Sequence, residues 1–302
     1  MKVLLAISES RGAKVAAEFL ETIPLPHNSI VTVLHIVELP RLAPQYPGYY
    51  RTLESWCQQA FADANRLVTS VATRLRGSGV RVQTRVVKGI PRRDLVKAIR
   101  RLRPGLVILG PHTHPRVARF FLGSVSEHML SVAPCSVLIA RSRRRTVPSS
   151  KPRVLFATDF SQDADAAATF LPRLNLPRSS RITVAHVDEQ VEEVMARFVA
   201  KGRPDLHQAL AKAVRVRQRQ LARLLERVGR RFVRHGWTVT PSIVNGYPAE
   251  QLLRLATKQR ADLIVLGSRG LTGFKRMLLG GVSGKVARHA PCSVLVVRRT
   301  PR

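Results

Sequence analysis

Short apolar runs alternate with longer amphipathic stretches along the second half of the chain. Residues 263–266 are wholly apolar, whereas residues 206–234 repeat their apolar positions at helical spacing on one face. The predicted elements are, in order, a strand at 153–158, a helix at 161–174, a strand at 182–187, a helix at 206–234, a strand at 237–244, a helix at 249–258, a strand at 263–266, a helix that includes 284–289 and a strand at 293–297.

This alternation predicts an α/β fold with a parallel sheet. Parallel neighbours need long connections between them, and such crossovers are right-handed. The fully apolar strands at 263–266 and 294–297 suit a sheet that is covered on both faces. We therefore expect a doubly wound sheet of five parallel strands in the order 3-2-1-4-5.

The same pattern occurs twice, because the chain contains an internal repeat. Residues 133–141 (APCSVLIAR) and 290–298 (APCSVLVVR) match at seven of nine positions. Gly89-Ile-Pro91 likewise corresponds to Gly246-Tyr-Pro248. The sequence thus predicts two doubly wound domains in tandem. Their expected bounds are 1–142 and 151–302, joined by a polar, basic linker at 143–150.

Length and composition agree with two globular domains, but the charge is lopsided. The 302 residues are 45% hydrophobic, and 51 Lys and Arg face 19 Asp and Glu, which gives a net charge of +32. Such a charge favours acidic partners: nucleotides, nucleic acid or anionic membrane surfaces. Only ten of the cations are Lys, and a broad Arg surplus can also reflect compositional drift.

The predicted helix at 206–235 is especially basic. Its polar face could follow a phosphate backbone, but few aromatic residues accompany it, so it encodes no platform for stacking bases. A solvated helical face is the simpler interpretation of this segment.

The cysteines and the hydropathy of the chain indicate in which cellular compartment the protein is expected. Cys57, Cys135 and Cys292 form no C-x-x-C pair and cannot build a disulfide framework. No stretch approaches 18 apolar residues, and the first residues lack the apolar core of a signal peptide. We expect a soluble, cytoplasmic protein without a membrane span.

Unusual residues follow the first and fourth predicted strands of the second copy. In a doubly wound sheet, ligands bind at the carboxyl ends of the strands where the strand order reverses. Residues 157–161 (ATDFS) follow the first strand there, and residues 267–284 after the fourth hold six glycines. A helix starting near Val282 would point its positive end at a bound anion, and a phosphate group is the natural guest. These glycines could instead only shape a connection.

Two common phosphate-binding motifs are absent, whereas a third is present. The chain contains neither G-x-x-x-x-G-K-[ST] nor a G-x-G-x-x-G after the first strand. Gly267-x-x-Gly270, nine residues and then Gly280 resembles the ATP-binding signature G-x-x-G-x9-G-[S/T] of the universal stress protein family. The resemblance extends to Asp159, to Gly246-Tyr-Pro248 and to the final strand, and it covers nearly the whole chain.

This resemblance implies an ATP-binding α/β domain. Asp159 and the neighbouring backbone would meet adenine and ribose, and Val187 would flank the adenine. Gly267 and Gly270 would approach ribose and phosphates. The cofactor-binding residues expected from the resemblance are Ala157, Thr158, Asp159, Val187, Gly267, Ser268, Arg269, Gly270, Gly280, Gly281, Val282 and Ser283. Mg²⁺ or Mn²⁺ is expected to accompany the ATP, and no metal ligand is assigned.

Both copies depart from the family signature. Gly281 stands where the signature has Ser or Thr, which leaves Ser283 as the nearby hydroxyl. In the first copy Ser8 replaces the Asp and Thr113 the second Gly, while Gly123-Ser124 keeps the phosphate end. We expect the first copy to be a degenerate site and the second to bind ATP.

The expected function is that of an ATP-dependent regulatory module in a stress response. No catalytic residue is assigned, because no general base or Ser/His/Asp set is visible, and any ATP hydrolysis would be slow. The expected partners are ATP and unidentified proteins. The two copies should form a pseudo-dimer through their last strands, and pairing of whole chains is left open. The alternative is a nucleotide-independent basic module that binds other molecules, including nucleic acid.

Overall fold

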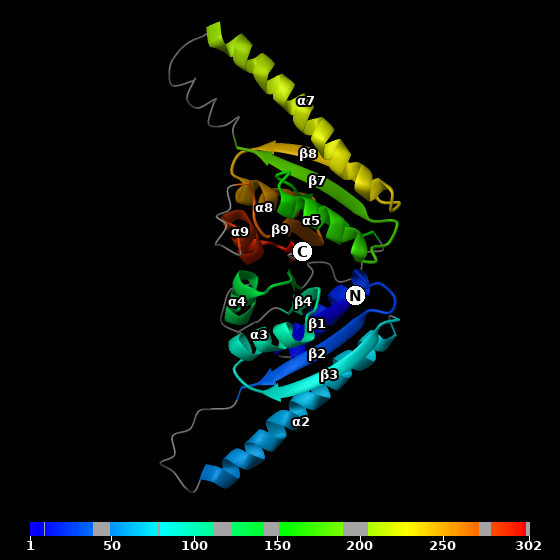
Figure 1. Ribbon diagram of the computed structural model, residues 1–302, viewed down its shortest axis with the longest axis vertical. Coiled ribbons are helices and arrows are strands. Elements are labelled where there is room, and N and C mark those ends of the chain that lie inside the picture. Colours follow the sequence, from blue (N-terminus) through cyan, green and yellow to red (C-terminus); the bar gives the residue numbers. More distant parts are fainter. Residues whose placement is uncertain are drawn as a thin grey trace. The chain divides into compact units, whose positions relative to one another are not determined.

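A computed structural model describes residues 1–8, 10–38, 49–77, 79–110, 122–141, 151–189, 205–271 and 279–299 (Figure 1). These residues fall into two compact units, one within Met1–Ser142 and one within Arg143–Arg299. The expected linker at 143–150 lies outside the described residues, so its bounds stay a prediction.

Unit 1 is a five-stranded parallel sheet with its connecting helices. Its sheet has the order β3-β2-β1-β4-β5. Its elements are β1 (Lys2–Ile7), α1 (Ser10–Thr22), β2 (Ile30–Val37), α2 (Tyr49–Arg76), β3 (Arg81–Lys88), α3 (Pro91–Leu102), β4 (Leu106–Leu109), α4 (Ser124–Val132) and β5 (Ser136–Ile139).

Unit 2 repeats this arrangement with the order β8-β7-β6-β9-β10, again with parallel pairs. Its elements are β6 (Arg153–Ala157), α5 (Gln162–Phe170), η1 (Leu171–Arg173), β7 (Arg181–Asp188), α7 (Asp205–Val233), β8 (Thr238–Asn245), α8 (Pro248–Lys258), β9 (Leu263–Gly267), α9 (Gly281–His289) and β10 (Ser293–Val297). The predicted α/β class and the strand order 3-2-1-4-5 are confirmed in each unit.

One predicted helix is shorter than its pattern suggested. The α-helix expected at 161–174 ends at Phe170 and continues as the 3-10 turn η1. Pro172 lies in that turn, and a proline has no N–H to continue an α-helical ladder. The apolar spacing alone did not reveal this change.

The core of unit 2 holds α7 against the sheet. Every residue of β9 and β10 is buried. Phe232 of α7 packs edge-on against Phe156 of β6, with ring centroids 5.0 Å apart. Pro241 of β8 pairs with Val184 of β7. Because β8 is an outer strand of unit 2, the missing N–H of the proline is tolerated there.

The carboxyl ends of β6 and β9 lie next to each other. Phe156 of β6 pairs with Val265 of β9, close to the end of both strands. The turn after β6 and the loop after β9 therefore leave the sheet side by side, at the edge where the strand order reverses.

Candidate functional site

The turn after β6 has an uncommon backbone conformation. Phe160 has a φ of 63°, which a bulky side chain rarely adopts. Its N–H donates to Thr158 Oγ1 at 3.0 Å, and the Ser161 N–H donates to Asp159 Oδ1 at 3.0 Å. The Phe160 ring lies 4.8 Å from the ring of His186, whose Nδ1 is 2.9 Å from the Thr158 carbonyl oxygen. Backbone strain of this kind is common at binding sites.

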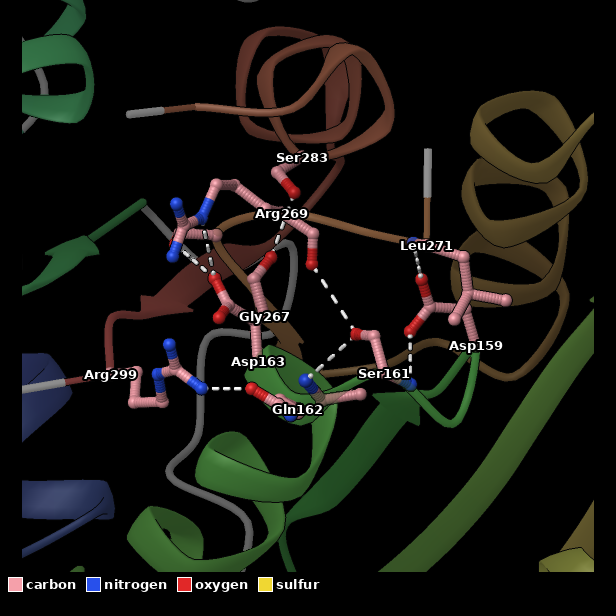
Figure 2. A network of polar contacts seen from close by, with 11 residues as sticks. Asp159, Ser161, Gln162, Asp163, Gly267, Arg269, Leu271, Ser283 and Arg299 are labelled. Carbon is pink, nitrogen blue, oxygen red and sulfur yellow. Dashed lines mark hydrogen bonds and ion pairs between the residues drawn. The ribbon is translucent and has the colours of Figure 1, made fainter. Parts of the chain in front are cut away.

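Asp159 joins this turn to the loop after β9, as Figure 2 shows. Its Oδ2 accepts a hydrogen bond from the Leu271 N–H at 2.9 Å. A Cβ at Gly270 would lie 2.6 Å from the same oxygen, so only a glycine fits here without a shift. Asp159 and Gly270, the Asp and the second Gly of the motif, therefore pack directly against each other.

Gly267 allows the first turn of α5 to approach β9. A Cβ at Gly267 would lie 2.6 Å from the Asp163 carbonyl carbon and 2.8 Å from the Ala164 nitrogen. Ser161 caps this helix by accepting the Ala164 N–H at 3.2 Å. The N-terminal end of α5 is thereby fixed against the backbone of the site.

Asp163 is buried behind the loop and orders two of its residues. Its Oδ2 accepts a hydrogen bond from Arg269 Nε at 3.2 Å (Figure 2). The same oxygen accepts a second hydrogen bond from Ser268 Oγ at 2.8 Å. The Arg269 side chain is still 30% exposed. One guanidinium is therefore held in place at the site while part of it remains open to solvent.

The start of α9 presents backbone N–H groups to the same region. Gly280 is its N-cap, with no side-chain cap, and its own N–H donates to the Ser268 carbonyl at 2.7 Å. The N–H groups of Gly281, Val282 and Ser283 have no acceptor within the helix, as in any first helical turn. Together with the helix dipole they make this end attractive to an anion.

The Ser283 hydroxyl is turned inward. Ser283 is buried, and its Oγ donates to the Gly267 carbonyl at 2.8 Å. A hydroxyl has a single proton to donate, so this bond leaves none for a phosphate oxygen. In contrast, a Cβ at Gly281 would have no atom within 4 Å, so the position that lacks the family's hydroxyl has room for one.

The structure brings three groups of predicted residues to one edge. Ala157 ends β6, and Thr158 and Asp159 follow it. Gly267 ends β9 and residues 268–270 follow it, while Gly280 caps α9 and residues 281–283 form its first turn. Val187 lies on the neighbouring strand β7, two residues beyond the position that pairs with Ala157. Their roles in binding a ligand remain predictions.

The expected binding residues left out three contributors, Asp163, Ser161 and Leu271, although Ser161 and Leu271 lie within the two stretches that the sequence singled out. An acidic residue in the first turn of a helix is usually explained by the helix dipole, so Asp163 carried no separate signal. The cap at Ser161 was visible as a Ser before an Ala-rich helix. The Leu271 contact uses a backbone N–H, which no sequence motif marks.

Unit 1 keeps a hollow at the equivalent edge, although its motif is degenerate. A cavity of about 360 Å³ is bordered by Ser8, His35, Glu38 and the start of α4 at Gly123–Ser126, among others. Burial lowers the pKa of His35. Thr113, which stands in place of the second Gly of the motif, lies outside the described residues, so the predicted loss of nucleotide binding by unit 1 stays a prediction.

Within the described ranges, no helix is long and apolar enough to cross a membrane. The same residues contain no group of three His, Cys, Asp or Glu side chains suited to a metal ion.

The fold and site define a class: a tandem pair of doubly wound α/β domains with a glycine-rich loop after the fourth strand of the second. A model of the universal stress protein family matches residues 1–141 and again 152–298. The chain belongs to the universal stress protein family, as a tandem two-domain member.

Several relatives illustrate this membership. A universal stress protein of Mycolicibacterium smegmatis is 25% identical over 301 residues, which is 98% of this chain and 96% of that protein. One of Thermus aquaticus is 31% identical over 149 residues, 48% of this chain and 97% of that protein. One of Methanocaldococcus jannaschii is 39% identical over 75 residues, 25% of this chain and 44% of that protein.

Solved structures share the fold. A universal stress protein from Archaeoglobus fulgidus superposes with a TM-score of 0.68 at 22% identity, covering 99% of this chain and 98% of its own. Two matches are described with bound nucleotide, one in complex with cAMP and one from Arabidopsis thaliana with AMP. Their TM-scores of 0.34 and 0.35 are too low to carry a ligand over to this chain.

Proposed function

We propose that unit 2 binds ATP at the edge formed by β6, β9 and the start of α9, and that the bound nucleotide regulates the protein's interactions. The observation that carries this proposal is the first turn of α9. Three N–H groups without helical acceptors meet a loop that Asp159 and Asp163 hold in place. Such a fixed, positively polarised backbone suits a phosphate chain.

Different residues of the proposed site would bind different parts of the nucleotide. The N–H groups of Gly281 to Ser283 would donate to phosphate oxygens, and the partly exposed Arg269 would add a positive charge. Asp159 uses two of its lone pairs on backbone N–H groups, and a carboxylate has about four. The remaining lone pairs are free to accept hydroxyl or amino protons of a ribose or adenine.

We propose that Mg²⁺ or Mn²⁺ accompanies the ATP. Phosphate oxygens supply most ligands of such an ion when a protein offers few carboxylates. A nucleotide bound at the start of α9 would alter the surface offered to a protein partner. The proposed output is regulation of these interactions rather than rapid turnover of ATP.

We further propose that the two units pair through β5 and β10, the last strands of their sheets. Pairing of strand edges satisfies backbone groups that are otherwise left to solvent. Small-angle X-ray scattering of the whole chain tests this pairing: a single compact particle is expected, and two domains separated by an extended linker would contradict it.

Calorimetric titration with ATP, ADP, AMP and adenosine tests the proposed site. If the start of α9 holds phosphates, affinity should rise with each added phosphate, and ATP should bind at least tenfold more tightly than adenosine, about 1.4 kcal/mol. Equal affinities for ATP and adenosine would refute a phosphate site at this loop.

A further inference from the structure

The exposed side of α7 carries a continuous row of cations. Successive residues of an α-helix are rotated by about 100°, which places six basic residues of α7 within an arc of about 120°. At about 1.5 Å per residue the row is about 27 Å long. Its members, all exposed, are Lys212, Arg215, Arg219, Arg223, Arg227 and Arg230. We call this set the α7 row.

The opposite side of α7 is fixed to its own unit. Leu221, Leu225 and Phe232 are buried, and α7 packs against β7 and β8, beside which Figure 1 draws it. The helix is therefore anchored to its unit between Leu221 and Phe232, whereas none of its described residues before Leu221 is buried. The exposed members of the α7 row lie on the side of the helix opposite these buried residues.

Two other cations of α7 are occupied within unit 2. Arg217 Nη2 donates to Asp188 Oδ1 at 2.9 Å, and the buried Asp188 raises the pKa of the Arg217 guanidinium. Arg231 pairs with Asp165. Among the residues that the structure describes, the six members of the α7 row form no ion pair, and one acid, Glu226, lies on the same side of the helix. Like charges at i,i+4 spacing destabilise a helix, so such a row has a cost in folding.

The equivalent helix of unit 1 shows that this charge is local. α2 has 28 residues against the 29 of α7. Of its described cations, Arg66 and Arg74 pair with Asp63 and Glu21, and Arg76 is the last residue of the helix. Much of the remaining exposed side is neutral, with Gln, Asn, Ser and Thr. A general drift of composition towards Arg would have affected both helices, yet only α7 has the row.

We propose that the α7 row binds the phosphate backbone of double-stranded nucleic acid, without reading its sequence. Arg supplies five of the six cations, and its planar fork suits phosphate oxygens. Leu221, Leu225 and Phe232 are buried within unit 2, so binding of α7 to a membrane would lack their apolar contribution and depend mainly on charge, which favours the duplex. The row contains no aromatic side chain on which unpaired bases could stack, which argues against a single strand.

The salt dependence of binding to a fluorescein-labelled 30-base-pair DNA duplex tests this proposal. Fluorescence anisotropy without nucleotide, between 50 and 200 mM salt, should give a slope of log K against log salt of about −5, because each neutralised phosphate contributes about −0.9. Replacing four members of the row in one variant (R219Q, R223Q, R227Q and R230Q) should reduce the slope to about −2.

A matched variant removes the same charge elsewhere. Arg85, Arg92, Arg100 and Arg101 are exposed residues of unit 1, and their combined replacement by Gln should leave the slope near −5. Far-ultraviolet circular dichroism and ATP titration of both variants confirm folding, and ATP binding should be unchanged because the row does not touch the proposed nucleotide site.

Three results would overturn the proposal. The first is an equal reduction of the salt slope in both four-residue variants, which would assign duplex binding to the net charge alone. The second is a slope near zero in the unchanged protein. The third is binding to vesicles with anionic lipid at salt concentrations where the duplex is not bound, which would make a membrane the partner.

Discussion

At the residue scale, Gly270 and Gly281 occupy opposite environments in the same loop region. A Cβ at Gly270 would lie 2.6 Å from Asp159 Oδ2, whereas a Cβ at Gly281 would meet nothing within 4 Å. Equal chemical changes at these two positions therefore test whether the packing around Asp159 supports ligand binding.

We expect Gly270→Ala to lower ATP affinity by more than tenfold, because the new Cβ would displace the Asp159 carboxylate, which accepts the Leu271 N–H and is the proposed partner of the nucleoside. Gly281→Ala should change the ATP affinity less than twofold. Gly281→Ser should raise the ATP affinity, because it introduces the hydroxyl that the family signature has at this position. Isothermal titration calorimetry of the three variants measures these effects. Equal affinities for Gly270→Ala and Gly281→Ala would show that the contact with Asp159 is irrelevant to binding.

Ser283 illustrates how a structure changes the meaning of a motif residue. The resemblance implies a phosphate ligand, yet the hydroxyl donates to the Gly267 carbonyl. We expect Ser283→Ala to destabilise the protein by about 1–3 kcal/mol, since it leaves a buried acceptor unpaired. Urea unfolding measures this loss. The ATP affinity of the folded variant should fall less than that of Gly270→Ala, and a larger fall with unchanged stability would restore Ser283 as a direct ligand.

At the scale of elements, the repeat places an arginine in the same uncommon conformation twice. Arg103 follows α3 with a φ of 47°, and Arg260 follows α8 with a φ of 50°. Positive φ is costly for a side chain with a Cβ and free for glycine, which is why helices so often end in Gly.

We therefore expect Arg103→Gly and Arg260→Gly each to stabilise the protein by roughly 0.5–1 kcal/mol, the relief of the left-handed conformation less the entropy that glycine adds to the unfolded chain. Arg254→Gly, within α8, is the matched control and should instead cost about 1 kcal/mol. Denaturant unfolding compares all three. Destabilisation at Arg260 equal to that at Arg254 would contradict the argument.

The pattern of the sequence predicted the elements more completely than the contacts of the site. Wholly apolar strands such as β9 and the one-sided apolar face of α7 reveal themselves by spacing, because burial selects for them. Three features of the site depend instead on which elements meet in space. They are the inward orientation of the Ser283 hydroxyl, the positive φ of Phe160 and the hydrogen bonds that Asp163 accepts. Those contacts follow from tertiary packing, and no local spacing encodes them.

At the scale of the whole molecule, the two units have diverged while keeping one fold. Unit 2 combines Asp159, Gly270 and the glycine cap of α9, whereas unit 1 has Ser8 at the position of Asp159 and retains a cavity of about 360 Å³. The chain has a net charge of +32, so weak electrostatic attraction of ATP to the surface must be distinguished from binding at a specific site.

The stoichiometry of ATP binding to the whole chain at 150 mM salt tests this account most directly. Calorimetry should find one tight site per chain, which Gly270→Val removes and Ser8→Ala in unit 1 leaves unchanged. Two equivalent sites, or one tight site that survives Gly270→Val with the same affinity, would contradict the assignment of ATP to unit 2.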